Sequence, residues 1–152
     1  MPPFRFRLET LLRLRIGERD ERRADLAKAL RAEAMLRDER ERIGIEQIEI
    51  QTAIRQRSAP GSADVDALLR VSRYQAVLKA RDQQLEQQLT QVIAEVERRR
   101  LVLAEADRQV RVLEKLRERQ FADHRQRANR LEIKELDEVA ATGHLRRAEV
   151  RA

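Results

Sequence analysis

Residues 78–113 read LKARDQQLEQQLTQVIAEVERRRLVLAEADRQVRVL, and this stretch is the strongest indication of the fold. Apolar side chains recur at alternating steps of three and four residues, in two columns that each repeat every seven residues. The columns are Leu78, Leu85, Val92, Arg99, Ala106 and Leu113, and Leu89, Val96, Leu103 and Val110. Such spacing predicts a left-handed coiled coil. Only Arg99 interrupts the apolar seam after Leu85.

Residues 4–57 predict another long helix, because residue types that favour helices dominate there. Its inner face is less regular than that of the second helix. Two columns mark it: Leu8, Arg15, Arg22, Ala29, Leu36, Ile43 and Ile50, and Leu12, Arg19, Leu26, Glu33, Arg40, Gln47 and Ile54. Since the second column is often polar, this half of the seam is expected to pack loosely.

Residues 58–63 carry the single interior turn signal. Ser58-Ala59-Pro60-Gly61-Ser62 combines a Pro-Gly turn with a Ser placed to cap a following helix. Asp64 and Asp66 should then lie in the first turn, where acidic groups favour the helix dipole. The second helix is expected over residues 64–142 and a basic tail over 143–152, with Gly143 at the helix end. The prediction is an all-α fold, a long two-helix antiparallel coiled coil forming one domain over residues 1–152.

The second predicted helix is longer than the first, so it should overhang it. At 1.5 Å per residue the helices measure roughly 80 and roughly 120 Å. In an antiparallel hairpin Arg57 faces Asp64, so Phe4 should lie opposite the region of Arg117. Residues after about Arg119 then have no intramolecular partner, although some remain apolar. These are Phe121, Ala128, Leu131, Ile133, Leu136 and Val139. Either another protein covers them or the extension frays.

The composition argues against an enzyme. Charged residues make up 39% of the chain and aromatic residues 3%, and there is no Cys, which is consistent with a reducing cytoplasm. No apolar run reaches the length of a membrane span, and the start lacks a secretory signal. His124 and His144 have no Cys or acidic partners at ligand spacing, and no Gly-rich phosphate loop is present. We therefore expect no catalytic residues, no metal and no cofactor.

The formal net charge of +6 is concentrated toward the chain ends. Residues 1–57 hold 14 Lys and Arg against 11 Asp and Glu, residues 58–97 hold 4 against 6, and residues 98–152 hold 15 against 10. If the ends meet, they form one basic end. Pairing also brings Arg15, Arg19 and Arg22 to the height of Arg99. These arginines are either solvated one by one or form a polar layer that binds an acidic partner.

Two other classes of function remain open at this stage. A homo-oligomeric structural coiled coil would form if the hairpin opened and helices paired between chains. Nucleic-acid binding ranks lower, because acids are interleaved with the bases and no aromatic side chains alternate with them for stacking. A membrane-surface helix ranks lower still, since the apolar seam is needed for the partner helix.

Four short motifs follow one another along the chain. The first two are Phe4-Arg-Phe-Arg-Leu-Glu-Thr-Leu-Leu12 and Tyr74-Gln75. The most specific are Leu113-Glu-Lys-Leu-Arg-Glu-Arg-Gln120 and Glu132-Ile-Lys-Glu-Leu-Asp-Glu-Val-Ala140. In these motifs, in their order, in the two-helix plan and in length, the chain resembles the flagellar FliJ family of type III export proteins over essentially its whole length.

The resemblance implies a cytoplasmic export component at the inner membrane, similar to the central stalk of rotary ATP synthases. Its implied partners are the flagellar export ATPase ring, the export gate protein and export chaperones, which it would escort. The implied ATPase contacts lie on the paired termini: Arg13, Arg15, Arg19, Arg22, Arg23, Arg117, Arg119, Phe121 and Arg125. The implied gate contacts are Tyr74, Val77, Leu78 and Arg81. Around Tyr74 the chain departs from the aromatic and apolar mixture of some relatives.

Overall fold

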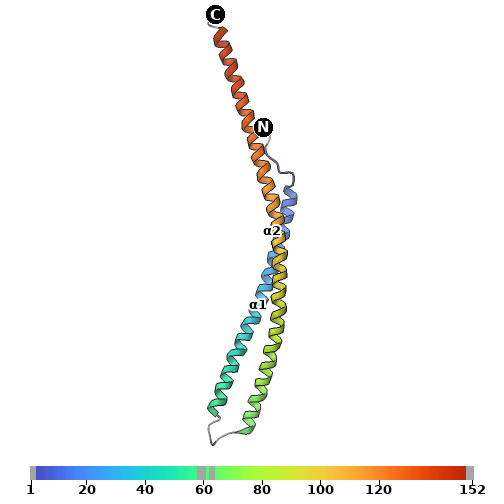
Figure 1. The fold of residues 1–152 in the computed structure, drawn as a ribbon, viewed down its shortest axis with the longest axis vertical. Helices are drawn as coiled ribbons and strands as arrows, with labels where there is room; N and C mark the ends of the chain where they lie inside the picture. Colours follow the sequence, from blue (N-terminus) through green and yellow to red (C-terminus); the bar gives the residue numbers. More distant parts are fainter. Residues whose placement is uncertain (1–2, 58–60, 62–63, 150–152) are drawn as a thin grey trace. The chain divides into compact units, whose positions relative to one another are not determined.

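The computed structural model describes residues 3–57, 61 and 64–149, with side chains described up to residue 142. It contains two helices, α1 (Glu9–Arg57) and α2 (Val65–Glu149), which pack side by side (Figure 1). No strand occurs among the described residues. The predicted all-α hairpin is confirmed.

The seam predicted for α2 is confirmed residue by residue. All ten side chains of its two heptad columns are buried or half-buried, whereas most of their neighbours are exposed. Four of the ten are buried: Leu78, Leu85, Val96 and Val110. On α1 the burial is sparser, as the polar second column predicts. Its buried side chains are Leu12, Ala29 and Ile43.

The contacts divide the chain into two units, each built from both helices. Unit 1 comprises residues 1–19 and 106–152, and unit 2 comprises residues 20–105. In unit 1 a small core forms around Phe6, Leu12 and Val110. In unit 2 the core consists of Ile43, Leu78 and Leu85, with Leu36 and Ile50 packed against it. The assignment of residues 1–152 to one domain stays a prediction.

Within each unit the two helices run antiparallel. In unit 2, Glu46 pairs with Tyr74 and Glu39 with Arg81, so the partner on α2 rises as the α1 number falls. In unit 1 the same trend links Arg19 to Asp107 and Glu9 to Arg117. These polar contacts agree with the register that the apolar seam gives each unit.

The chain enters α1 differently from the prediction. Helix α1 begins at Glu9 rather than near Phe4, and residues 3–7 form a non-helical segment that we call the N-terminal strap. Side chains in the strap alternate between outward and inward, with Phe4 half-buried and Phe6 buried. This alternation is the period of extended chain, and it lets both rings reach α2, which a helix would not. Phe4 accordingly lies against Phe121 and His124 rather than Arg117.

The start of α2 is capped by Asp64. The Asp64 carboxylate accepts hydrogen bonds from the backbone N–H groups of Asp66 (3.1 Å) and Ala67 (3.3 Å). These are N–H groups that a helix start leaves without an intrahelical acceptor. Asp64 is therefore the cap itself rather than part of the first turn. Ser62 lies outside the described residues, whereas Gly61 has φ +118°, a conformation that favours glycine.

Helix α2 ends later than predicted. It continues through Thr142 and Gly143 to Glu149, so Gly143 does not terminate it, and residues 143–149 are helical rather than a separate tail. A single Gly inside a helix costs only about 1 kcal/mol relative to Ala. Its helix-favouring neighbours, including Ala140, Ala141 and Leu145, compensate for that cost.

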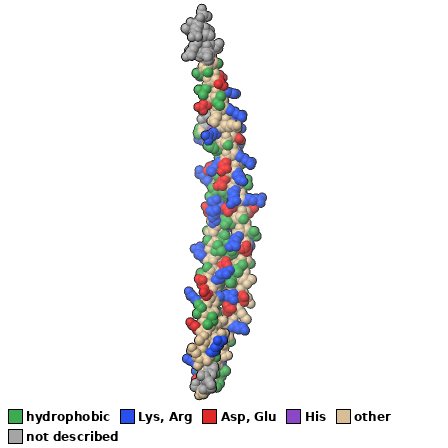
Figure 2. Space-filling view, turned by 60° about the vertical axis from the view of Figure 1, so that its left-hand side comes forward, with side chains coloured by type: hydrophobic (Ala, Val, Ile, Leu, Met, Phe, Trp, Pro, Cys, Tyr) green, Lys and Arg blue, Asp and Glu red, His purple; other side chains and the backbone are tan. Residues whose placement is uncertain are grey.

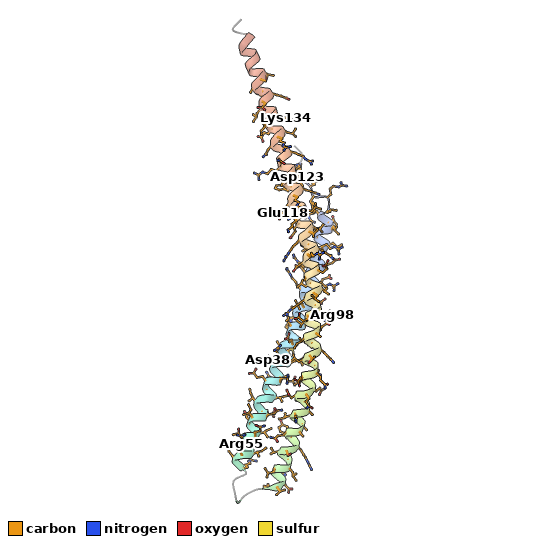
Figure 3. The ribbon with its side chains drawn as sticks, in the orientation of Figure 1. Asp38, Arg55, Arg98, Glu118, Asp123 and Lys134 are labelled. Carbon is orange, nitrogen blue, oxygen red and sulfur yellow. The ribbon has the colours of Figure 1, made fainter. Side chains whose placement is uncertain are left out.

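The predicted overhang is present in unit 1. Beyond His124, the part of α2 whose side chains are described is exposed except for the half-buried Ala128. Figure 3 labels Lys134 on this part of α2. The exposed apolar side chains there are Leu131, Ile133, Leu136 and Val139. Nowhere in the described residues is a helical stretch both long and apolar enough to span a membrane.

Candidate interaction surfaces

The net charge of the chain belongs entirely to unit 1. By sequence, unit 1 holds 17 Lys and Arg against 11 Asp and Glu, whereas unit 2 holds 16 of each. Both signs are interspersed on the face drawn in Figure 2. The predicted basic end therefore corresponds to unit 1, and an acidic partner would be attracted to it over unit 2.

The terminal surface of unit 1 contains seven of the nine side chains expected to contact an ATPase. Four of them already have acidic neighbours. Arg13 lies 3.6 Å from Glu9, Arg15 2.7 Å from Glu18, Arg19 3.9 Å from Asp107 and Arg117 3.9 Å from Glu9. Arg19 is only 20% exposed, so it supports the helix pair more than it presents charge to solvent.

The other three members of this surface, Arg119, Phe121 and Arg125, are exposed. Neither Arg119 nor Arg125 has an ion pair or hydrogen bond within the described part of the chain. Phe121 is 51% exposed, and the ring of Phe4 meets it edge-on at a centroid distance of 5.4 Å. Arg111 and Lys115 are also exposed on this part of α2. Their spacing of four and eight residues from Arg119 marks the same helical face, a signal that sequence reasoning missed.

Arg22 and Arg23 belong to unit 2, so the structure does not bring the nine side chains together within one unit. Arg23 lies 3.8 Å from Asp20, and Arg22 lies 4.0 Å from Asp25. Arg15 and Arg19 fall in unit 1, whereas Arg22 and Arg99 fall in unit 2. The predicted layer of four arginines is thus divided between the two units.

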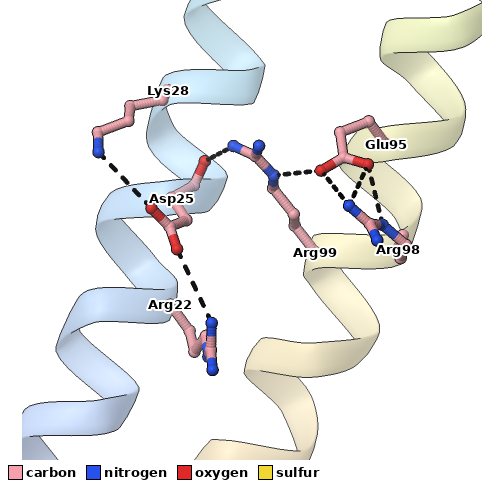
Figure 4. Close-up of polar contacts among 6 residues, drawn as sticks. All are labelled: Arg22, Asp25, Lys28, Glu95, Arg98 and Arg99. Carbon is pink, nitrogen blue, oxygen red and sulfur yellow. Dashed lines mark hydrogen bonds and ion pairs between the residues drawn. The ribbon is translucent and has the colours of Figure 1, made fainter.

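The part of that layer in unit 2 is a bonded polar cluster (Figure 4). Arg99 occupies the seam of α2, donates to the carbonyl of Asp25 on α1, and donates to Glu95 at 2.6 Å. Arg98 holds the same carboxylate through two hydrogen bonds of 2.7 and 2.9 Å. The cluster lines a hollow of about 220 Å³ with Arg22, Asp25 and Val102. A guanidinium on the seam is tolerated here because it is hydrogen-bonded on both helices.

Electrostatics within this cluster shift the acid–base equilibrium of Glu95. Its carboxylate accepts hydrogen bonds from Arg98 and Arg99, which lower the pKa of Glu95 to about 2. The hydrogen bond from Arg98 is the largest cause. Glu95 is thus ionised throughout the physiological range, and its charge balances part of the positive charge of residues 98–100.

The second candidate surface, the Tyr74 surface, comprises Tyr74, Val77 and Arg81 on unit 2. Tyr74 and Val77 are exposed, as a contact requires, but the fourth expected side chain, Leu78, is 4% exposed and belongs to the core. The Tyr74 hydroxyl donates to Glu46, which raises the pKa of Tyr74, and Arg81 donates to Glu39. A hollow of about 620 Å³ lies alongside, lined by Ala32, Met35, Leu36, Asp38, Glu39, Arg42, Ile43, Glu46 and Arg81.

One interhelical pair in unit 2 was not anticipated from the sequence. Arg40 donates to both carboxylate oxygens of Asp82, at 2.8 and 3.2 Å, and lies 3.9 Å from Glu86. The hydrogen bond from Arg40 lowers the pKa of Asp82. Asp82 lies seven residues before Leu89, so it holds a heptad position like that of Arg40 on α1. Two polar seam residues at matching heights were the signal for this pair.

The chain offers no constellation for metal binding within its described residues. His124, on a seam position, is half-buried and packs against Phe4 at a centroid distance of 5.7 Å, as a structural side chain. The side chain of His144 lies outside the described residues. Both candidate surfaces consist of charged groups on the helices, with apolar side chains exposed between them.

Comparison with known proteins yields one match. A family model described as Flagellar FliJ protein covers residues 4–149, nearly the whole chain. No curated protein and no solved structure shows significant similarity. The family match spans both helices, the N-terminal strap and the overhang.

Proposed function

The chain belongs to the flagellar FliJ family, and from that premise we propose that it binds the ring of the export ATPase through unit 1 and promotes its assembly and coupling. Family membership assigns the chain to flagellar protein export, as an export-associated protein rather than a known enzyme. Within that role, the terminal surface of unit 1 is the part best equipped to contact a second protein.

The observation that carries this proposal is the distribution of charge. Unit 2 is formally neutral, whereas unit 1 carries the entire excess of +6. Several arginines of the hairpin lie beside acids, such as Arg13 beside Glu9 and Arg37 beside Glu33, whereas Arg119 and Arg125 of unit 1 are exposed without an ion pair in the described structure. Charges of this kind speed association with an acidic surface, and their contribution falls with ionic strength.

The overhang of α2 supplies an apolar complement to this charge. Leu131, Ile133, Leu136 and Val139 stay exposed because α1 does not extend along them. Burying apolar area stabilises a complex by about 25 cal/mol per Å² before the costs of association. A partner that covers the overhang would therefore gain both apolar burial and charge pairing.

Contacts with the export gate protein and with export chaperones form the second part of the proposal. For the gate, Tyr74, Val77 and Arg81 are the candidate contacts, while Leu78 supports them from the core. The exposed apolar side chain of Val77 between two polar ones fits a small protein-binding surface. We place this activity at the cytoplasmic face of the inner membrane, reached through partners.

Direct binding to the cognate export ATPase, measured across a salt series, tests the ATPase contact. We expect binding that weakens as salt rises, and Arg119→Gln combined with Arg125→Gln should weaken it further. The matched control replaces two exposed arginines of unit 2, Arg31 and Arg55, by Gln. Equal losses in both variants would reject unit 1 as the ATPase-binding surface, and no binding by the unaltered chain would reject the function itself.

The gate contact needs a separate measurement, because it involves another surface. Val77→Glu should abolish binding of the cytoplasmic part of the export gate protein while leaving ATPase binding unchanged. Ile133→Glu, an equally exposed change on the overhang, is the control that should leave gate binding intact. If Val77→Glu leaves gate binding intact, the Tyr74 surface is not the gate contact.

A further inference from the structure

The N-terminal strap covers an apolar part of α2 that would otherwise be open. Phe6 is buried in the core of unit 1 with Leu12 and Val110, and Phe4, Leu113 and Leu116 pack against that core. The ring of Phe4 extends the contact to Phe121 and His124. Two aromatic side chains from five residues thus occupy the same face of α2 that α1 occupies further along.

The strap is attached more weakly than the helix that follows it. Among the described residues, a single backbone hydrogen bond ties the strap to the start of α1, from the N–H of Glu9 to the carbonyl of Phe6 (3.2 Å). Arg5 and Arg7 point outward without an ion pair in the described structure. Phe4, the outer of the two anchors, is only half-buried. The Phe4 end of the strap therefore opens locally at lower cost than the Phe6 end, which belongs to the core.

The surface under Phe4 has the chemistry of a site for an aromatic or apolar side chain. It offers the rings of Phe121 and His124, and the exposed Arg125 lies four residues after Phe121, on the same face of α2. An apolar patch beside an exposed Arg, on the unit that carries the net positive charge, suits an apolar side chain next to acidic ones. The strap itself supplies the aromatic ring but carries Arg5 and Arg7, so its own charge is unfavourable at this position.

We propose that the strap is a displaceable cover, and that the export ATPase binds the surface beneath Phe4 by replacing it with an apolar side chain flanked by acids. The inference rests on the proposed function and assigns a role to the Phe-x-Phe motif at positions 4 and 6. While the strap is docked, this surface is occupied, and the apparent affinity for the partner is reduced by the fraction of molecules in which it is docked.

The two sides of the Phe4 contact should respond in opposite directions. Phe4→Ala frees the surface and should lower the concentration of the chain that half-saturates the ATPase by about fivefold, within the usual range of coupling between sites. Phe121→Ala removes part of the surface and should raise that concentration. Arg5→Ala combined with Arg7→Ala, which leaves both rings in place, is the control for altered strap charge. It should fall short of the Phe4→Ala effect.

A reversible lock compares the docked and the released strap in one protein, so both states carry the same substitutions. Because the chain has no Cys, Phe4→Cys with Phe121→Cys can be joined by a thiol-reactive crosslinker that contains a cleavable bond. The locked protein should lose ATPase binding, and cleaving the linker should restore it in the same sample. Trypsin cleavage after Arg5 and Arg7 reports on the strap without any ATPase. It should be faster in Phe4→Ala and slower in the locked protein.

These outcomes separate the strap from the proposed function. If the unaltered chain does not bind the ATPase, the proposed function fails. If it binds but the lock changes nothing, or if Phe4→Ala and Phe121→Ala both weaken binding, then the strap is a structural element and the inference is overturned.

Discussion

Asp64 illustrates how a single side chain positions a long helix. Its carboxylate bonds two backbone N–H groups at the start of α2, and it directly follows the turn region that contains Gly61. From the sequence, a Ser of the turn was the expected cap, and Asp64 was expected in the first turn of the helix. Which of them caps the helix depends on where the turn ends, which local composition does not define.

Asp64→Ala removes this cap and should destabilise the chain by about 1 kcal/mol, the usual cost of replacing an Asp N-cap by Ala. Asp64→Asn keeps an acceptor oxygen and should recover most of the loss. Urea unfolding monitored by circular dichroism measures both. An unchanged midpoint in Asp64→Ala would show that another residue caps α2.

Glu95 should make the stability of unit 2 depend on pH in the acidic range. Its pKa is about 2 in the folded chain, below the ordinary value of 4.5, so its bonds to Arg98 and Arg99 stabilise the fold above about pH 4.5. This contribution is lost as the pH falls through 2. The midpoint of thermal unfolding should therefore fall less steeply between pH 4.5 and 2 in Glu95→Gln than in the unaltered chain. Identical slopes would contradict the cluster in Figure 4.

Leu78 shows what the heptad pattern could and could not decide at the scale of residues. The pattern placed Leu78 on the seam, and it is buried there. Family resemblance placed the same residue in the gate contact, which its burial does not favour. Heptad spacing encodes the direction of a side chain toward the partner helix, whereas a contact with another protein leaves no comparable period in one sequence.

Among the elements, the helices were predictable because many seam side chains follow the same heptad spacing. The ends were not, since each depends on a few local contacts. Helix α1 begins at Glu9 because Phe4 and Phe6 pack better from an extended segment, and the Phe-Arg-Phe-Arg alternation was the available signal for it. Helix α2 passes Gly143 because helix-favouring neighbours outweigh one Gly.

Two glycines inside α1 offer a test of helix energetics. A Cβ added at Gly17 or Gly44 meets nothing within 4 Å, and neither residue has a positive φ. Each Gly→Ala change should therefore stabilise the chain by about 0.5–1 kcal/mol, through helix propensity and a less flexible unfolded state. Gly61→Ala, at φ +118°, should destabilise it. Chemical unfolding of the three variants measures these signs, and a stabilising Gly61→Ala would refute the turn geometry.

Substitutions of Arg99 test whether this polar side chain lowers the stability of the seam. Arg99→Leu restores an apolar side chain at a heptad position and leaves Glu95 bonded to Arg98, so stability should rise by about 1 kcal/mol. Arg99→Ala should lower stability instead, because it removes packing without replacing it. Urea midpoints of the two variants decide the matter. A loss of stability in Arg99→Leu would mean that the hydrogen bond to Asp25 outweighs apolar packing.

At the scale of the whole molecule, charge rather than shape distinguishes the two units. The sequence indicated an excess of positive charge toward both chain ends, and antiparallel pairing assigns both ends to unit 1. The arginines expected to contact the ATPase were harder to predict, because the position of an Arg near a chain end does not show which acid it pairs with. Arg22 and Arg23 fell in unit 2, while Arg111 and Lys115 in unit 1 were overlooked.

Activity of the cognate export ATPase, titrated with this chain, is the first test of the proposed role of unit 1. We expect a saturable rise in ATP hydrolysis that shrinks as salt increases. Replacing Arg13, Arg119 and Arg125 by Gln should shift the titration to higher concentrations, whereas replacing Arg31, Arg42 and Arg55 of unit 2 should not. No change in activity at any ratio or salt concentration would contradict the account and favour a purely structural coiled coil.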